Sequence, residues 1–429
     1  MKVNKFLLTY NEALGDFSVD YDKIKTPYKA IKRFVKLLDE EVNDARLQGM
    51  IEYPLNEILL LAFLAILSGA SSWADLERFG NSKLKFLRKF LPFKNGTPSH
   101  DTFRRVFSLI DPKELEKATV VFVMDFFEKV KKTLKLKFEG KDQIIVDGKE
   151  ACSSGRNYGT EDEIRNLQTL HVYDATNEIC LASEIINQKT NEIPVARDLL
   201  SKTDLKGKIV SFDALHTQKE TVKVIVSKGG DFVGGLKGNQ SELYNTSQEL
   251  FTDENLNKIQ KTKNYFKFEI EKNHRQIELR EMYRVDTSNV YIDEEWVNIN
   301  SIICYVKKIT DYKKNKSTIE KRYYISSIKD ITLVADAIRN HWSIENKLHW
   351  HLDMTFGEDN NSTMDKNAFA NFSLMNKMCL SLLKLIQPRY KVGLNCIKKS
   401  FGWELQGMIS ELLCYYSKSE IQNALIYKK

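Results

Sequence analysis

The sequence predicts a mixed α/β fold in which a central sheet is flanked by helical regions toward both ends of the chain. Three observations predict it. Apolar residues recur at helical spacing through the first 140 residues. Short apolar runs separated by turn signals and helical patterns begin near residue 142, and helical spacing returns from Thr332 onward.

Length and composition set the outer bounds. A chain of 429 residues is longer than one compact core usually covers, which predicts two or three domains. Hydrophobic residues make up 42% and charged residues 29%, a balance typical of globular proteins. The net charge of +7 permits binding to nucleic acid without demonstrating it, because the location of charge matters more than its sum.

The cysteines and the apolar runs exclude other classes. The six cysteines show no CxxC pair, which argues against a zinc cluster or a disulfide framework. The apolar run at 58–68 is too short to cross a bilayer and predicts a buried helix. Because the first residues lack a signal-peptide pattern, we expect a cytoplasmic protein with no membrane partner.

The N-terminal region, residues 1–138, should be helical. One helix is predicted by apolar positions at helical spacing, namely Ile58, Leu61, Ala62 and Ile66. We expect two further helices at 73–79 and 84–90, and then a helix that Ser99 or Asp101 can cap. That last helix carries Arg104 and Arg105. A basic helix at this place suits a DNA-binding region and a plain helical bundle equally well.

The central region should form a sheet. The expected elements are a strand at 143–148, two strands joined by a turn at 175–178, a helix at 193–203, a strand at 208–214, a helix at 218–227 and a strand within 229–240. This order of strands and helices is that of a ribonuclease-H-like core, a mixed sheet flanked by helices.

The sheet pattern then changes. Between about 242 and 327 polar and apolar residues alternate, which predicts a β insertion of antiparallel strands with a lysine-rich hairpin tip near 311–322. The later helices should break at Pro388 and Gly402. We therefore divide the chain into a helical, DNA-binding region (1–138), a catalytic domain (139–365) and C-terminal helices (366–429).

Two aspartates mark strand ends. Asp147 and Asp213 each stand at the carboxyl end of a hydrophobic strand, where ligands gather in an open sheet. If the two strands are neighbours, their carboxylates lie close enough to share a metal ion. The alternative is that each aspartate only forms the next turn or helix cap.

Glu345 is the third candidate. On the helix expected from Thr332, one face should carry Ile338, Trp342, Glu345, His349, Leu352 and Phe356. A carboxylate within such an apolar stripe is costly to bury unless a positive group satisfies it. A metal cation would do so, and so would an ion pair with a basic residue such as His349 one turn on.

Three carboxylates suit a particular chemistry. Mg²⁺ or Mn²⁺ prefers hard oxygen ligands, and two such ions about 3.5–4 Å apart can activate an attacking hydroxyl and stabilise the leaving oxygen. His341, Glu345 and His349 could also be drawn as a zinc site, but they lack HExxH spacing and a cysteine partner. No glycine-rich phosphate loop is present in the sequence.

Basic and polar side chains near the strand ends are candidate contacts to DNA phosphates. With the two arginines of the N-terminal region, these candidates are Arg104, Arg105, Lys149, Arg156, His216, Lys237, Asn239, Gln240 and His341. Solvated loop charge is the equally good alternative.

Long motifs in a fixed order carry a family resemblance. In the N-terminal part they are DARLQGMIEYPLNEILLLAFLAILSGASSWADLERF and GTPSHDTFRRVFSLIDP. In the central part they are IIVDGK, QKTNEIPVARDLL, IVSFDALHTQ, GGDFVGGLKGNQ, RYYISS and RNHWSIENKLHWHLDMTFGED. From about residue 44 to residue 384 the chain resembles the ISAs1 family of bacterial insertion-sequence transposases, which includes the H-repeat-associated proteins and is related to the IS4-type enzymes.

The resemblance implies a ribonuclease-H-like DDE core that cleaves DNA at element ends and transfers the strand into target DNA. It implies that Asp147 in VDGK, Asp213 in SFDA and Glu345 in HWSIEN are catalytic and hold Mg²⁺ or Mn²⁺, as two ions. The implied partners are double-stranded DNA with terminal inverted repeats, target DNA, and further copies of the chain in a synaptic complex near the nucleoid. The alternative is a domesticated or inactive relative that acts as a DNA nuclease or DNA-binding protein.

The sequence departs from the related pattern at defined positions. The IS4-type signature places a tyrosine and an arginine before the glutamate and a lysine seven positions after it, whereas this chain has Ile338, His341 and Leu352. The roles of those residues are therefore not carried over. The run VDGKEACSSG also differs from the family's VDGKTLRGS-like run, which has an arginine near the first aspartate.

Overall fold

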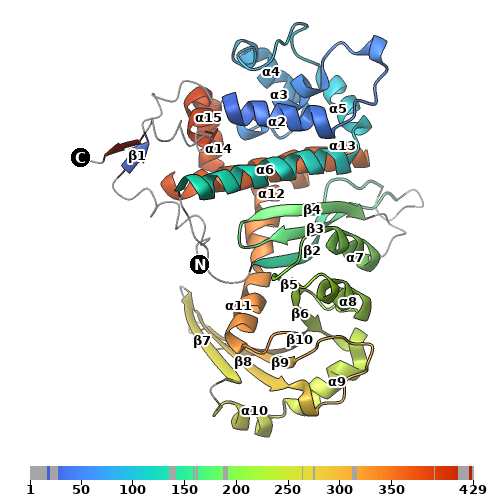
Figure 1. Ribbon diagram of the computed structural model, residues 1–429, viewed down its shortest axis with the longest axis vertical. Helices are drawn as coiled ribbons and strands as arrows, with labels where there is room; N and C mark the ends of the chain where they lie inside the picture. Colours follow the sequence, from blue (N-terminus) through green and yellow to red (C-terminus); the bar gives the residue numbers. More distant parts are fainter. Residues whose placement is uncertain are drawn as a thin grey trace.

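The computed structural model describes residues 17–19, 28–134, 142–157, 160, 163–186, 192–262, 264–273, 276–311, 316–390, 392–413 and 425–427. Figure 1 shows a helical layer at one end of the long axis and a sheet whose strands follow one another toward the other end. Among the described helices, none combines the length and the apolar character that a membrane crossing requires.

The N-terminal helices form one side of the helical layer. They are α2 (Tyr28–Glu41), α3 (Leu55–Leu67), α4 (Trp73–Leu87), α5 (His100–Leu109) and α6 (Pro112–Leu134). Helix α3 is buried from Glu57 to Leu67, as the apolar run predicted. The Ser99 side chain accepts a hydrogen bond from the Thr102 N–H and caps α5, which also agrees with the sequence.

One expectation for this region was wrong, because the helices expected at 73–79 and 84–90 are a single helix, α4. Gly80 in its middle is a place of close approach. A Cβ there would lie 2.8 Å from Thr97 Cγ2 and 2.9 Å from Leu61 Cδ1. The residues between the two expected helices therefore pack against α3 and do not form a break.

The C-terminal helices complete the layer. They are α13 (Lys366–Tyr390), α14 (Leu394–Trp403) and α15 (Leu405–Leu413). Helix α13 packs on α3, α5 and α6, so both ends of the chain contribute to one apolar core. The breaks expected at Pro388 and Gly402 come slightly later, because α13 ends two residues after the proline and α14 one residue after the glycine. A short antiparallel pair, β1 (Phe17–Val19) with β11 (Leu425–Tyr427), also joins the two ends.

The first five strands of the large sheet have the predicted order. They are β2 (Gln143–Ala151), β3 (Leu167–Asp174), β4 (Ile179–Ile186), β5 (Ile209–Phe212) and β6 (Asp231–Leu236), arranged in space as β4-β3-β2-β5-β6. The first three are antiparallel, and β5 and β6 run parallel to β2. With α7 (Glu192–Lys202) and α8 (Lys219–Ser227) between the strands, this confirms the ribonuclease-H-like core.

The insertion extends this sheet. Strands β7 (Phe266–Asn273), β8 (Gln276–Asp286), β9 (Ser301–Asp311) and β10 (Lys316–Ser326) are antiparallel, and β10 pairs with β6 to make nine strands. The alternating pattern predicted these strands. It was wrong for the start of the insertion, where α9 (Ser241–Leu250) and α10 (Asp253–Ile259) pack Leu243 and Leu256 against the sheet core. The centre of the expected hairpin tip, 312–315, lies outside the described residues.

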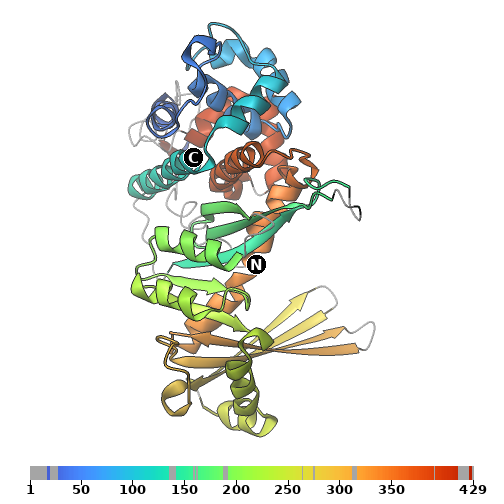
Figure 2. The same ribbon diagram turned by 90° about the vertical axis from the view of Figure 1, so that its right-hand side faces the viewer.

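The helical layer and the sheet are linked by a chain segment that crosses between them, drawn in orange in Figures 1 and 2. It consists of α11 (Ile331–His341), a π turn (Glu345–His349) and α12 (Trp350–Met354). Helix α11 packs Val334, Ala335 and Ile338 on one face of the sheet. This segment carries the third candidate carboxylate.

Candidate active site

Asp147 and Asp213 lie next to each other across the sheet. In the parallel pair β2–β5, Val146 stands opposite Phe212, and each aspartate is the residue that follows its member of that pair. The carboxyl ends of parallel strands meet at one edge of a sheet. The two strands are therefore neighbours, as the shared-metal argument requires.

Glu345 reaches the same edge from the π turn. Single ligand atoms of Asp147, Glu345 and His349 all lie within 4.8 Å of one another. His349 Nδ1 is 3.6 Å from Glu345 Oε2 and 3.9 Å from Asp147 Oδ2. The charge of Asp213 acts on Asp147 from the neighbouring strand. Asp147 and Glu345 are thus brought together from segments far apart in the sequence, and Asp213 follows the strand next to that of Asp147.

The carboxylates at this edge lie close to one another, and their negative charges affect the pKa of Asp147. The pKa of Asp147 is raised to about 6, chiefly by burial and also by the negative charges of Glu345 and Asp213, while His349 and the Gly148 N–H oppose the shift. The pKa of Glu345 is lowered, chiefly by its contact with His349. A buried carboxylate with a raised pKa and acidic neighbours is typical of a functional site.

The expectation that Glu345 lies within a buried apolar stripe was wrong. Its side chain is 60% exposed, and Trp342 is also exposed. The buried face instead carries Ile344, Leu348, Leu352 and Phe356. The π turn contains more residues per turn than an α-helix, and this shifts which residues face the core. The Glu345 carboxylate therefore opens to solvent, and the cost of burying it is not what calls for a cation.

A pair of buried histidines lies behind the acids. His171 on β3 stands opposite Asp147 in the antiparallel register, and its ring centroid is 5.2 Å from that of His349. Both residues are almost fully buried. Among the described residues, neither ring nitrogen of His171 has a hydrogen-bond partner. The same holds for Nε2 of His349. Burial lowers the pKa of His171 well below its usual value, so its ring is neutral.

Sequence reasoning considered His349 only as an ion-pair partner or part of a zinc site, and it missed His171. Its position opposite Asp147 could have been read from the hairpin register once the turn at 175–178 was fixed. The contact between the two rings could not, because it joins β3 to a helical segment about 180 residues later.

Asp213 forms the turn that follows β5. Its Oδ1 accepts hydrogen bonds from the N–H groups of Leu215, at 3.0 Å, and His216, at 3.2 Å. This is the turn-forming role that was the alternative for a strand-end aspartate. His216 is buried, and its Nε2 lies 3.7 Å from Glu192 Oε2. Burial and the charge of Asp213 raise the pKa of Glu192, a fourth acidic side chain that sequence reasoning missed.

The loop residues after β6 shape the segment around Asp213. Asn239 Nδ2 donates to the Ala214 carbonyl at 2.7 Å, and Gln240 Nε2 donates to the Thr217 carbonyl at 2.8 Å. Lys237 at the start of this loop is exposed. Of these three candidate DNA contacts, the amides have structural hydrogen bonds and the lysine faces solvent.

Two other candidate DNA contacts lie in enclosed places. The Lys149 side chain is 7% exposed and its Nζ is 2.6 Å from Asp353 Oδ1, with carboxylates of Glu358 and Asp359 at 3.7 and 3.4 Å. His341 Nδ1 lies 3.1 Å from Ser211 Oγ, and burial lowers the pKa of the His341 ring to about 4. Both side chains are therefore held by the protein and are not presented to a phosphate in this structure.

The three arginines among the candidates differ. Arg104 and Arg105 are exposed on α5 in the helical layer, where Arg104 contacts Asp101. Arg156 donates to the carbonyls of Ser153, at 2.8 Å, and Gly155, at 2.6 Å, and so closes its own loop. The structure thus presents the α5 arginines to solvent, whereas Arg156 has local partners.

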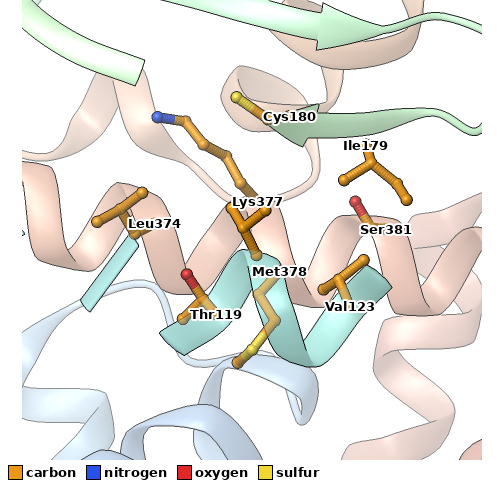
Figure 3. A pocket seen from close by; sticks show the side chains of 9 residues that line it. Thr119, Val123, Ile179, Cys180, Leu374, Lys377, Met378 and Ser381 are labelled. Carbon is orange, nitrogen blue, oxygen red and sulfur yellow. The ribbon is translucent and has the colours of Figure 1, made fainter. Parts of the chain in front are cut away.

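A small cavity in the helical layer is separate from this site. Figure 3 shows it between α6, the start of β4 and α13, lined by Thr119, Val123, Ile179, Cys180 and residues of α13 including Lys377. None of the clustered acids lines it. The acidic edge of the sheet is therefore the candidate active site.

Comparison with known proteins gives consistent matches. The family model described as a transposase DDE domain matches residues 139–382, and the model described as DDE_Tnp_1-associated matches residues 38–123. The H repeat-associated putative transposase YhhI of Escherichia coli K12 is 33% identical over 351 residues, which cover 80% of this chain and 88% of the relative.

Two further similarities were found. The putative transposase YncI of Escherichia coli O157:H7 is 30% identical over 370 residues, covering 82% of this chain and 90% of the relative. Among solved structures, a piggyBac transposase synaptic complex with hairpin DNA aligns with a TM-score of 0.38 at 11% identity, covering 98% of this chain and 82% of that one.

Proposed function

The chain belongs to the DDE transposases of the IS4-like, H-repeat-associated kind, and from this premise we propose that it cleaves DNA at the ends of an insertion element and joins those ends to target DNA. The observation that supports this most is the convergence of Asp147, Asp213 and Glu345 at one edge of the sheet. Like charges repel, so carboxylates with only structural roles would not be expected to lie together at this edge.

The family implies a divalent metal, and the residues at this edge fit one. Carboxylate oxygens are the donors that Mg²⁺ and Mn²⁺ prefer. The spacing of Asp147, Glu345 and His349 within 4.8 Å is compatible with ligands around one ion. Asp147, Asp213 and Glu345 are the side chains that would hold two Mg²⁺ or Mn²⁺ ions. His349 is placed to add a nitrogen donor.

Bound divalent ions lower the pKa of an attacking water and neutralise the charge that builds on the phosphate. In the first step a new bond forms between water oxygen and phosphorus, and the bond to the 3′ oxygen of the element end breaks. The freed 3′-hydroxyl then attacks a target phosphate and releases a target 3′ oxygen. The proposal has the DNA approach from the side of Glu345, whose carboxylate is exposed to solvent.

The partners follow from this chemistry. Terminal inverted repeats and target DNA are the proposed substrates, and bringing two ends together requires at least two copies of the chain. Arg104 and Arg105 on α5 and Lys237 beside Asp213 are the exposed side chains proposed to contact phosphates. Such contacts make affinity fall steeply as salt rises.

A cleavage assay tests the proposal. The substrates are duplexes made from the DNA that flanks the gene, with Mg²⁺ or Mn²⁺. Asp147→Asn, Asp213→Asn and Glu345→Gln should each abolish cleavage and leave DNA binding largely intact. The matched control is Asp198→Asn on α7, whose partner is Lys202, and it should cleave normally. Normal cleavage by any of the first three variants would remove that residue from the mechanism. DNA binding without cleavage by the unaltered protein would favour the inactive, DNA-binding alternative.

A further inference from the structure

Three charged residues, two of them buried and the third partly so, form a cluster at the π turn. Lys347, two residues after Glu345, places its Nζ 2.9 Å from Glu178 Oε1. Lys384 of α13 places its Nζ 2.7 Å from Glu178 Oε2 and donates a hydrogen bond to the Lys347 carbonyl at 2.6 Å. We call Glu178, Lys347 and Lys384 the Glu178 clamp. It ties the π turn to the β3–β4 hairpin and to the helical layer at once.

Glu178 has an unusual backbone for its residue type. It ends the turn between β3 and β4 with a φ of 57°, in the left-handed region that glycine and asparagine favour. Its side chain is only 7% exposed. The hairpin turn itself does not require a buried glutamate in that conformation. The two lysines explain the burial, because their charges lower the pKa of Glu178 to about 2 although burial alone would raise it.

The π turn decides where Glu345 points. The Trp350 N–H donates to the Glu345 carbonyl, a link over five residues where an α-helix would use four. Returning this turn to α-helical geometry would remove one residue from it and rotate Glu345 relative to α12 by about 100°. The carboxylate would then leave the vicinity of Asp147. Contacts that stabilise the π turn therefore also keep the Glu345 carboxylate close to Asp147.

We propose that the Glu178 clamp is a positioning device, which keeps Lys347 in the π turn and thereby holds the Glu345 carboxylate within reach of Asp147 for metal binding. The inference rests on the proposed function, since it concerns the same acids. None of the clamp residues touches the reacting atoms. They act through the backbone that carries Glu345.

The first test compares buried lysines on one helix. Lys384→Met and Glu178→Gln break the clamp. The matched control is Lys377→Met, which removes another buried lysine of α13, the one labelled in Figure 3. The hydrogen bond of Lys377 goes to Ser183 of β4. Two quantities are measured on the metal-free full-length protein: the thermal unfolding midpoint and the Kd for Mn²⁺ from calorimetric titration. All three variants should unfold at lower temperature, and only the clamp variants should bind Mn²⁺ about 10-fold or more weakly, the usual loss when support of a ligand is removed.

The double variant Glu178→Gln/Lys384→Met separates positioning from stability. Glu178→Gln alone leaves both lysines without their carboxylate, whereas the double variant leaves only the partly exposed Lys347. The unfolding midpoint of the double variant should therefore recover from that of Glu178→Gln toward that of the unaltered protein. Its Mn²⁺ Kd should stay weak, and in the cleavage assay kcat should fall with little change in KM for DNA.

The outcomes are decisive in both directions. Clamp variants that lose stability like Lys377→Met but keep the Mn²⁺ Kd of the unaltered protein would overturn the positioning role, and so would a double variant that regains affinity together with stability. If the unaltered protein binds Mn²⁺ but does not cleave DNA, the proposed function fails while the titrations still decide the clamp. A protein that binds no Mn²⁺ overturns both.

Discussion

Replacing Lys149 by methionine should destabilise the protein by about 3 kcal/mol. The Lys149 ammonium is 2.6 Å from Asp353, 3.4 Å from Asp359 and 3.7 Å from Glu358. Breaking a buried ion pair typically costs about 3–5 kcal/mol, because the remaining charge is left without a partner. The lower end applies here, since only Glu358, at 4% exposed, is fully buried, while Asp353 and Asp359 are 25% and 37% exposed and can regain water.

The pH dependence of this loss has a definite sign. Burial alone would lower the pKa of Lys149, but the charges of Glu358, Asp353 and Asp359 outweigh burial and raise it. A raised lysine pKa gives stability that is fully present below the unfolded value and is lost as pH rises through the folded one. The difference between the unaltered protein and Lys149→Met should therefore stay constant from about pH 6 to 9.

Guanidinium unfolding at pH 7 measures the loss, and DNA affinity as a function of salt measures the competing role. Lys237→Met, at an exposed position in the loop beside Asp213, is the control. A phosphate contact changes stability by less than about 0.5 kcal/mol but reduces the dependence of log Kd on log salt by about one unit. We expect the first behaviour from Lys149→Met and the second from Lys237→Met. Normal stability with a reduced salt dependence in Lys149→Met would refute the structural role.

Three further predictions concern separate parts of the molecule. Mn²⁺ at about 100 times its Kd should raise the free energy of unfolding by about 2.7 kcal/mol, as seen in denaturant curves, and Glu345→Gln should lose most of this gain. Burial lowers the pKa of Lys398 to about 8, so below that pH the folded state carries a costly charge. Lys398→Met should therefore stabilise the protein by about 1–2 kcal/mol at pH 7, a figure from which the lost hydrogen bond to the Thr355 carbonyl is already subtracted. This stabilisation should decrease as the pH rises from 8 to 10.5. Arg105→Ser should weaken binding to duplexes of any sequence, and an effect confined to one sequence would contradict a phosphate contact.

The sheet could be predicted from the sequence because its signals are local. Each core strand is a short apolar run with a turn residue after it, and the order of runs and helices was enough to specify the neighbours of β2. The errors arose where tertiary contacts override local signals. Gly80 reads as a possible break but packs closely on α3, and residues 241–259 were placed in an alternating segment although Leu243 and Leu256 lie on the buried faces of two helices.

The position of the candidate acids could be predicted from the sequence, but the contacts that support them could not. Asp147 and Asp213 follow from strand ends, and Glu345 from a motif, but a helical period of 3.6 cannot reveal a π turn. The sequence offers Lys149 only as a candidate DNA contact, because its partners Asp353, Glu358 and Asp359 lie about 200 residues further along the chain. Partners at such separations are set by the fold and leave no local pattern.

The distribution of lysines around the site supports its assignment as a cation site. Glu178 is paired with two lysines, and Asp353, Glu358 and Asp359 share Lys149. Within the residues that the structure describes, Asp147, Asp213 and Glu345 have no ion pair with a lysine or arginine, and only His349 approaches two of them.

Other acids of this region are thus paired with lysines, whereas Asp147, Asp213 and Glu345 are not. Burial, together with the negative charges of Glu345 and Asp213, raises the pKa of Asp147 to about 6. Asp147, the most enclosed of the three carboxylates, would be stabilised by one more lysine at the sheet edge, since a charge that is largely removed from water without a partner is costly. A cluster that must hold divalent ions would lose its function by gaining one, because a lysine would occupy the place of the metal. The omission of a lysine here is therefore better explained by metal binding than by packing.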